Sequence, residues 1–429
     1  MKSIIKNVML TVAVLSGLSF YAQNNRHIDN FRSPDKSGIN VFEAPKDTVS
    51  TFDKVKVRVG GASTLQFQSL SHSNNGGAGN ELAELGANFN LATANLDLDV
   101  ALADGVRMHL RTYLSSRHHP EPYVKGGYFQ IDKLDFISKG LLENVMKYTT
   151  LKVGHMENNY GDAHFRRSDN AQTLFNPFVG NLIMDSFTTE VGAELYYQRN
   201  GFLVMAGFAN GKLNQSVEKK ANGTTGGAAF LGKLGYDKQL NKDLRVRLTG
   251  SIYTTGYTPS LYLYSADRAG SRYYHVMEAP GSSGFRSGRF VPNFKHSVTA
   301  VMFNPFVRYK GFEFFGTIER ASGGTNYDSA GEFLPEELTG VADQLSGELL
   351  YRFGKNENFY VGGRYNTVNS EYDGIDDITI ERVQAGGGWF MTKNILMKAE
   401  YVSQNYEGAT GRLDGGKFNG FMLEAAISF

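Results

Sequence analysis

Apolar and polar residues alternate at every second position through most of this sequence, and this alternation constrains the fold more than any other feature. The clearest run is Asn95–Leu102, in which four apolar residues at even-numbered positions share one face and Asn95, Asp97 and Asp99 share the other. A helix would spread those four side chains around its circumference, whereas a β-strand holds them on one side. The sequence therefore predicts a protein built from β-strands.

The next run repeats this alternation after the tripeptide Ala103–Asp104–Gly105, which predicts a hairpin. With Gly105 left-handed in a three-residue turn, Leu102 pairs with Val106. Apolar residues then meet on one face and opposite charges on the other, and a shift by one residue would mix the two faces. The charged pairs predicted by this register are Asp99 with His109 and Asp97 with Arg111.

Sixteen such runs follow one another along the chain. They lie near residues 55–70, 88–103, 105–117, 127–137, 148–156, 188–199, 201–210, 228–240, 243–256, 297–309, 311–321, 344–354, 358–369, 378–391, 394–405 and 418–429. Short turns alternate with long loops, and the long loops include 322–343 and 370–377. This pattern predicts an all-β fold, a transmembrane antiparallel up-and-down β-barrel of about 16 strands, with short periplasmic turns and long extracellular loops.

Aromatic residues give independent support for a membrane barrel. They gather at the short-turn ends of the predicted strands, where an amphipathic ring would lie between lipid and water. The aromatic core of a soluble β-sandwich would not explain this clustering at one end. The residues expected in this band are Tyr148, Tyr197, Tyr236, Tyr309, Tyr351, Phe353, Phe359, Trp389 and Phe429.

The chain begins with a segment that is typical of a secretory signal peptide. Lys2 and Lys6 flank the start of the apolar stretch Val8–Leu15, and cleavage is predicted after Ala22. That stretch is shorter than the ~18 residues that a spanning helix needs. We expect a signal peptide at 1–22, a polar N-terminal periplasmic arm or flexible tail at 23–54, and a transmembrane β-barrel at 55–429.

The composition excludes several classes of function. A net charge of +1 argues against nucleic-acid binding, and the absence of cysteine excludes disulfides and thiolate metal sites. His109 beside Asp99 has no serine opposite, so we expect no enzyme. Neither His118–His119 nor the acidic run at 373–377 has a full ligand set, so we expect no metal and no cofactor.

The last strand resembles the C-terminal strand of Gram-negative outer-membrane barrels. Its apolar residues alternate, and the sequence given stops on an aromatic residue. In that group the barrel-assembly machinery reads this strand as a signal. The resemblance implies this assembly role for Phe421, Leu423, Ile427 and Phe429.

The mature chain as a whole resembles the sixteen-strand porins of the outer membrane. Leu151–His155 and Asn176–Phe178 also resemble parts of the phosphate-selective porin O and P family, although no substrate can be transferred from such short motifs. The porin resemblance implies an outer-membrane location, a homotrimer and a third loop that folds into the barrel.

Strand parity predicts which charged side chains face the interior. Basic and acidic residues are equally frequent there, which favours a polar, water-filled lumen, although each one can equally serve as a structural ion pair. The predicted pore-lining residues are Asp97, Asp99, Arg107, Arg111, Lys152, Glu194, Arg245, Arg247, Arg308, Glu348, Arg352, Arg364, Arg382, Lys398 and Glu400, with further acidic positions at Asp132, Glu190, Glu313, Glu319 and Glu424.

The loop at 157–187 is the third long loop. Its apolar residues can anchor it to the barrel wall while its charges face the channel. By resemblance to the porins we expect it to form the constriction, with Arg166 and Arg167 nearest the eyelet; a solvated surface loop is the alternative. The predicted constriction residues are Asp162, His164, Arg166, Arg167 and Asp169.

These observations predict a porin for the passive diffusion of small hydrophilic solutes or ions, selected by size and by lumen charge. Its partners would be outer-membrane lipid and the permeating solutes. The alternative is a non-conducting barrel that serves as a structural or secretion-machinery component, with a closed lumen and a stable protein partner. A dedicated transporter, recognised by saturable transport, is a third reading.

Overall fold

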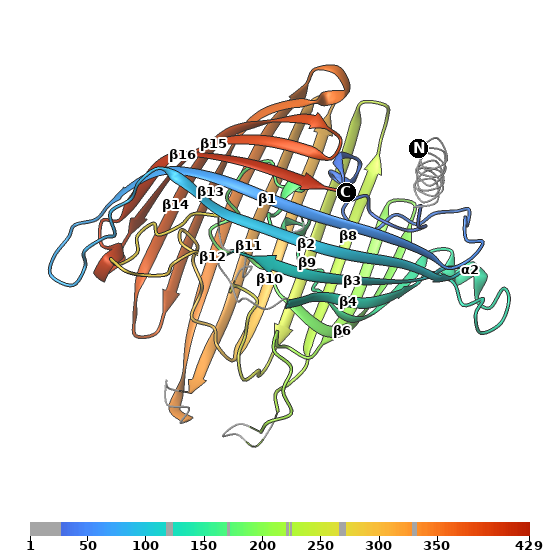
Figure 1. The fold of residues 1–429 in the computed structure, drawn as a ribbon. Helices are drawn as coiled ribbons and strands as arrows, with labels where there is room; N and C mark the ends of the chain where they lie inside the picture. Colours follow the sequence, from blue (N-terminus) through green and yellow to red (C-terminus); the bar gives the residue numbers. More distant parts are fainter. Residues whose placement is uncertain are drawn as a thin grey trace, which may run out of the picture.

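The computed structural model describes most of the chain as one closed barrel (Figure 1). The described residues are 27–116, 123–169, 172–219, 223, 225–265, 272–327 and 333–429, without the side chains of residues 91, 92, 327, 333, 375 and 376. The predicted signal peptide and His118–His119 lie outside them. No helix within these ranges is long and apolar enough to cross a membrane.

Sixteen antiparallel strands form the barrel, each hydrogen-bonded to its neighbours in the sequence, and the first strand pairs with the last. The predicted fold class is therefore confirmed. The strands are β1 (Lys56–Ser73), β2 (Asn88–Ala103), β3 (Val106–Ser115), β4 (Tyr123–Ile131), β5 (Thr149–Glu157), β6 (Thr189–Arg199), β7 (Phe202–Ala209), β8 (Ala229–Gln239), β9 (Leu244–Thr255), β10 (Ser297–Tyr309), β11 (Phe312–Tyr327), β12 (Phe333–Phe353), β13 (Phe359–Tyr372), β14 (Ile375–Thr392), β15 (Ile395–Glu407) and β16 (Lys417–Ser428).

Short turns join the strands at one end. A two-residue turn at Asn200–Gly201 has positive φ at both residues (54° and 90°), the conformation that matches the twist of a hairpin. The longest connection at this end contains a short helix, α2 (Glu143–Met146).

An apolar belt covers the outside of the barrel. On β12, Leu345 and Leu349 point outward and are half exposed, whereas their neighbours Gln344 and Glu348 point inward and are buried. The outward side chains become polar at Asp343, which pairs with Arg320 of β11 at 3.0 Å. This ion pair marks the edge of the belt towards the long loops.

The aromatic band lies at the other edge of the belt, as predicted. The rings of Tyr351, Phe353, Phe359 and Trp389 follow one another around the barrel at centroid distances of 5.9, 5.7 and 6.1 Å. All four are at least 40 % exposed on the outer face, where an amphipathic ring meets the boundary of lipid and water.

The register of β2 and β3 is nearly the predicted one. Asp99 lies opposite His109 and Asp97 opposite Arg111, but Ala103, not Leu102, pairs with Val106. The turn is thus one residue shorter than expected, and Leu102 forms a bulge that keeps the two faces in phase.

The strand boundaries differ from the prediction in three regions. The strand expected at 127–137 is β4, and it ends at Ile131, where Asp132 turns towards the N-terminal residues. The segments expected as long loops at 322–343 and 370–377 are mostly paired strand, since β11 and β12 continue to Tyr327 and Phe333 and only residues 373–374 separate β13 from β14. These extensions rise above the apolar belt, where both faces are polar and alternation gives no signal.

The C-terminal strand closes the ring. The backbone N–H groups of Gly61 and Phe429 donate to each other's carbonyl oxygens at 3.1 and 3.0 Å. Phe421, Leu423, Ile427 and Phe429 all point outward, with 42 to 62 % of each side chain exposed. Their role as an assembly signal stays a prediction.

Candidate functional site: the barrel lumen

The interior of the barrel is lined by charged side chains at the positions that parity predicted. Most of them are buried, and the half-buried Arg308 pairs with Glu357 at the short-turn rim. Three segments fold into this interior. We name them the N-terminal segment (residues 28–46), the inward loop (residues 158–188, without 170 and 171) and the outer loop (residues 256–296, without 266–271).

The N-terminal segment occupies the short-turn end of the lumen. The carboxylate of Glu43 pairs with Arg247 at 2.8 Å, and Lys46 pairs with Asp132 at 2.8 Å. Phe42 is 2 % exposed and packs edge-on against Phe306. The sequence predicted a periplasmic arm or a flexible tail here; a flexible tail does not describe residues 28–46, because their side chains find partners on the barrel wall.

The first half of the inward loop binds the wall formed by β8 to β12. Asp162 accepts hydrogen bonds from Arg247 at 2.7 and 2.8 Å and pairs with Lys233 at 3.0 Å. Arg166 pairs with Glu313 at 2.7 Å and with Glu348 at 2.5 Å. The loop therefore crosses the lumen from β5 and is fixed on the far side by buried ion pairs.

The second half of the inward loop is bound through its backbone. Lys398 donates to the carbonyl oxygens of Thr173, Asn176 and Phe178 at 2.9 to 3.1 Å. The carboxylate of Glu400 accepts from the amide of Val179 at 2.8 Å. Arg364 and Arg382 donate to further carbonyls, those of Gly180 and Asn181. The wall from β13 to β15 thus satisfies backbone groups that a buried loop cannot pair by itself.

The five predicted constriction residues are all buried, and they face three parts of the lumen. Arg167 forms a bidentate pair with Asp185 of the same loop at 2.7 and 2.6 Å, and Arg166 is paired as described. Asp169 lines a cavity beside β2 to β6, and His164 lies between that cavity and the small one beside the two arginines. Asp162 faces β8 and β9. The loop brings these residues into the lumen, but no single eyelet contains them all.

The outer loop lies over the inward loop from the long-loop end. The hydroxyl of Tyr264 donates to Glu319 at 2.8 Å, and that of Tyr273 donates to Glu400 at 2.7 Å. The amide of Phe290 donates to the carbonyl of Ile183 at 2.8 Å. Tyr264 and Tyr273 thus bind the outer loop to the barrel wall.

The ionisation of the buried loop charges follows from their partners. Burial alone would raise the pKa of Glu43, but the charges of Arg247 and Lys233 outweigh it and lower the pKa from 4.5 to about 2. The same two cations hold the pKa of Asp162 well below its usual value against the same opposing effect of burial. Both carboxylates are therefore charged at neutral pH, as an ion-pair network requires.

The two sides of the lumen differ in free space. Around Arg166, Arg167, Glu348 and Arg364 the cavity has a volume of about 20 Å³, enough for about one water molecule. Beside β2 to β6, a cavity of about 180 Å³ lies between the wall, the N-terminal segment and the inward loop. Room for a solute is therefore found beside Arg107 and Lys152, whereas little free space adjoins the predicted eyelet residues Arg166 and Arg167.

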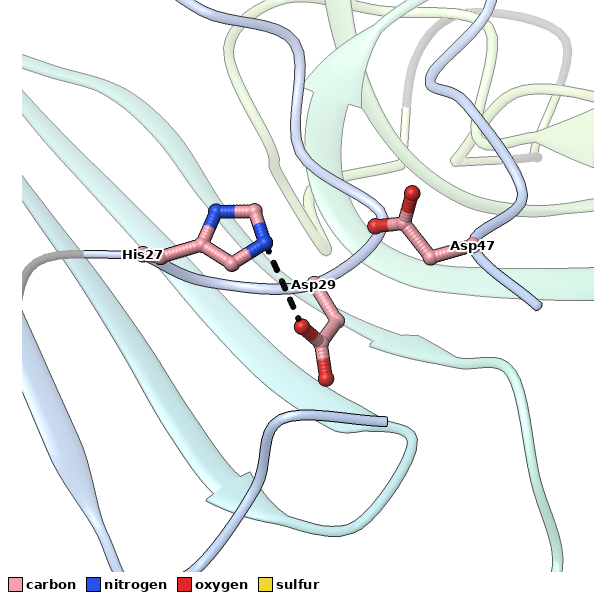
Figure 2. A group of neighbouring side chains, drawn as sticks. All are labelled: His27, Asp29 and Asp47. Atoms are coloured by element: carbon pink, nitrogen blue, oxygen red, sulfur yellow. Dashed lines mark ion pairs between the residues drawn. The ribbon is translucent and has the colours of Figure 1, made fainter. Parts of the chain in front are cut away.

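One group of side chains outside the lumen has the composition of a metal site. His27, Asp29 and Asp47 lie together at the beginning of the described chain, with His27 3.5 Å from Asp29 (Figure 2). The carboxylate of Asp29 already accepts hydrogen bonds from Thr51, and that of Asp47 accepts from Asn30. These contacts hold the N-terminal chain in a turn, and they account for the cluster without an ion.

Several lumen residues were not found from the sequence. Asn40 and Glu43 were assigned to a tail, yet Asn40 donates to Glu313 at 2.6 Å and also accepts from Arg166. The available signal was weak: Val41 and Phe42 form a short apolar pair within a largely polar segment. Asn304 binds the amide of Asp162 at 2.7 Å, and its inward parity was the only indication.

Comparison with known proteins identifies the fold. No family model and no curated protein matches the sequence. Among solved structures, the loop L8 deletion mutant of OmpT, an outer membrane protein of Vibrio cholerae, aligns with 88 % of this chain and 100 % of its own at 13 % identity and a TM-score of 0.50. An anion-selective porin from Comamonas acidovorans aligns with 88 % of this chain and 100 % of its own at 10 % identity and a TM-score of 0.50. The chain shares its fold with outer-membrane porins.

A trimer form of in-vitro folded OmpT from Vibrio cholerae aligns equally well, with 12 % identity, 88 % and 100 % coverage and a TM-score of 0.50. At such identities the likeness concerns the barrel only. The narrower resemblance to the phosphate-selective porin O and P family stays a prediction.

Proposed function

We propose that this protein is an outer-membrane porin that lets small hydrophilic solutes or ions diffuse passively through its lumen. The observation that carries this proposal is a closed sixteen-strand barrel with an apolar belt outside and buried charges inside. A barrel of this size is wide enough for an aqueous channel, and no lipid-exposed backbone group is left unpaired by closure. We expect no enzymatic activity.

The proposed constriction has two components. The inward loop narrows the middle of the lumen, and the N-terminal segment narrows its short-turn end. This extends the prediction from the sequence, which relied on the loop alone. The ion pairs of Asp162, Arg166 and Glu43 with the wall support a constriction of fixed shape, because a mobile loop would not keep buried charges paired.

The proposal includes how the chain reaches the membrane and assembles there. The segment at 1–22 would direct export and be removed, and the outward residues of β16 would be read by the barrel-assembly machinery. The apolar belt would contact outer-membrane lipid. A homotrimer is the proposed assembly, with the trimeric OmpT structure as its structural precedent.

One observation favours the alternative of a non-conducting barrel. The N-terminal segment, the inward loop and the outer loop fill the lumen from the short-turn end to the long-loop end, and many of their contacts are buried. A barrel filled in this way could act as a structural or secretion-machinery component whose outer surfaces bind a protein.

Single-channel recording distinguishes the two proposals. The folded protein would be inserted into a planar bilayer under a KCl gradient. Discrete, open, ohmic conductance steps are expected for the porin. A folded barrel that gives no steps would contradict the porin and support the non-conducting alternative, and co-purification from intact outer membranes would then look for the partner.

A further inference from the structure

Three cations that line the 180 Å³ cavity beside β2 to β6 form no close ion pair with any described carboxylate; Glu157 acts on Arg32, and Asp99 on Arg107, only at longer range. Among the described residues, no ion pair joins Arg32, Arg107 or Lys152 to an acidic side chain. Arg32 donates to the carbonyl oxygens of Gly38 and Phe165. Arg107 donates to the amide oxygen of Gln130 at 2.6 Å. Each of these three cations therefore keeps its full charge beside the cavity that it lines.

Lys152 is held by aromatic faces. Its ammonium lies 4.9 Å from the ring centroid of Tyr196 and 5.8 Å from that of Tyr128. A cation–π contact positions an ammonium group without cancelling its charge or using all of its donors. Lys152 is half-buried and makes no hydrogen bond within the described part of the chain, so it is the cation of this cavity that is most available to a ligand.

Three of the four carboxylates that share the cavity already have cationic partners. Asp97 forms a bidentate pair with Arg111 at 2.9 Å for both bonds, and Asp99 pairs with Arg58 at 3.0 Å. Asp169 lies 3.5 Å from Lys125. The remaining acid, Glu157, lies 3.2 Å from a ring nitrogen of His164. The field in the cavity is therefore positive, in a lining where acidic and basic side chains both occur.

We propose that this cavity is an anion-binding station on the permeation path, and that Arg107 and Lys152, with Arg32, set the ion selectivity of the channel. The proposal rests on the porin function. The ligands would be small anions: halides, inorganic oxyanions or short carboxylates. A cavity of about 180 Å³ holds roughly six water molecules at their liquid volume, which is the size of such an ion with a partial hydration shell.

The same geometry gives Arg166 and Arg167 no part in setting the ion selectivity. Both are charged, but Arg166 is bound to Glu313 and Glu348, and Arg167 is bound to Asp185. The cavity next to them is too small for a hydrated ion. Their role in this arrangement is to fix the inward loop against the wall, so that the free space remains on the opposite side.

The test compares reversal potentials under a KCl gradient. The variants are Lys152→Gln and the double variant Arg107→Gln with Lys152→Gln, and the matched control is Arg320→Gln, which removes a cation from the outer face. The slower migration of the unfolded form on gels after heating establishes folding. Lys152→Gln is the safer variant, because it leaves no described hydrogen-bond partner unsatisfied.

We expect the wild-type channel to conduct chloride better than potassium. The chloride-to-potassium permeability ratio should fall in Lys152→Gln, fall further to below one in the double variant, and stay unchanged in Arg320→Gln. A conducting wild type that prefers potassium, or a ratio that is unchanged in both lumen variants, would overturn the anion station and leave the porin function standing. A wild type without steps would overturn the porin function and the station with it.

Discussion

The two sides of the lumen carry the same kinds of side chain and use them differently. From β8 to β15, inward charges bind the inward loop and the N-terminal segment, as Arg247 binds both Asp162 and Glu43. From β2 to β6, charges pair along the wall, as Arg111 does with Asp97, or face the cavity, as Arg107 does. The β8 to β15 side is thus packed through buried ion pairs, and the β2 to β6 side retains room for solute.

This difference teaches that the role of a lumen charge depends on what is folded against it. Buried side-chain polar atoms without a described partner are frequent on the β1 to β6 wall, among them those of Gln66, Thr93 and Asn95. Such atoms are compatible with a wall that contacts water, because water can serve as their hydrogen-bond partner. On the opposite wall, from β8 to β15, such atoms are fewer among the described residues, at Ser251, Asn326 and Gln404.

The largest effect on this contrast is expected from a matched pair of arginines. Arg166→Ala should lower the free energy of unfolding by about 3 kcal/mol, because it breaks a buried ion-pair network that fixes the inward loop. Arg107→Ala should cost about 1 kcal/mol, since it loses one hydrogen bond, to Gln130. Urea titrations of the folded barrel, followed by circular dichroism, would measure both. Equal losses would show that the two sides are packed alike.

Acidification should loosen the packed side at its short-turn end. The pKa of Glu43 is about 2 in the folded protein and 4.5 ordinarily, so its pairing stabilises the fold above about pH 4.5. This stabilisation is lost as the pH falls from 4.5 towards 2. The hydrogen-exchange protection factors of residues 28–46, taken relative to the intrinsic exchange rate at each pH, should fall over that window, and Glu43→Gln should make these protection factors nearly independent of pH there. Protection that persists unchanged to pH 2 would contradict the assignment.

Two inward asparagines sharpen the comparison further. Asn304→Ala should cost about 2 kcal/mol, because its side chain binds the amide of Asp162 and the carbonyl of Gly316. Asn95→Ala should change stability by less than about 0.5 kcal/mol, since neither of its side-chain polar atoms has a partner among the described residues. The same urea titration applies, and a larger loss for Asn95 would mean that its wall is not open.

A small effect is also expected on the outer face of the barrel. Arg320 and Asp343 form a pair 3.0 Å apart, with side chains 64 and 45 % exposed. Arg320→Gln should therefore cost about 0–1 kcal/mol. This loss in the free energy of unfolding is the reference value for an ion pair that no loop covers. A loss as large as that of Arg166→Ala would imply that this pair is covered, for example by another subunit.

The wall of the barrel could be predicted from sequence because its determinants are local. Alternation sets the two faces, and pairs such as Asp97–Arg111 lie on neighbouring strands only 14 residues apart in the chain. Where alternation ends, prediction failed, as in the polar extensions of β11 and β12. The aromatic band was predictable for the same reason, since the position of a ring relative to a short turn is visible in the sequence.

The filling of the lumen could not be predicted in the same way. Arg166 was placed in the right loop, but its partners Glu313 and Glu348 lie 147 and 182 residues away, and any of the ten inward carboxylates was an equally good candidate. The N-terminal segment carries too few apolar residues for its burial to be predicted from the sequence. Its burial depends on charges that the wall supplies, and those meet it only when the barrel is closed.

The aromatic band contains the single tryptophan of the chain, and its fluorescence can follow membrane insertion without an added label. The indole of Trp389 lies on the outer face, 45 % exposed and stacked 6.1 Å from Phe359. Its fluorescence therefore reports the transfer of the β13–β14 surface from water to lipid. Because no other indole contributes, a blue shift on adding vesicles would time membrane insertion separately from any rearrangement inside the lumen.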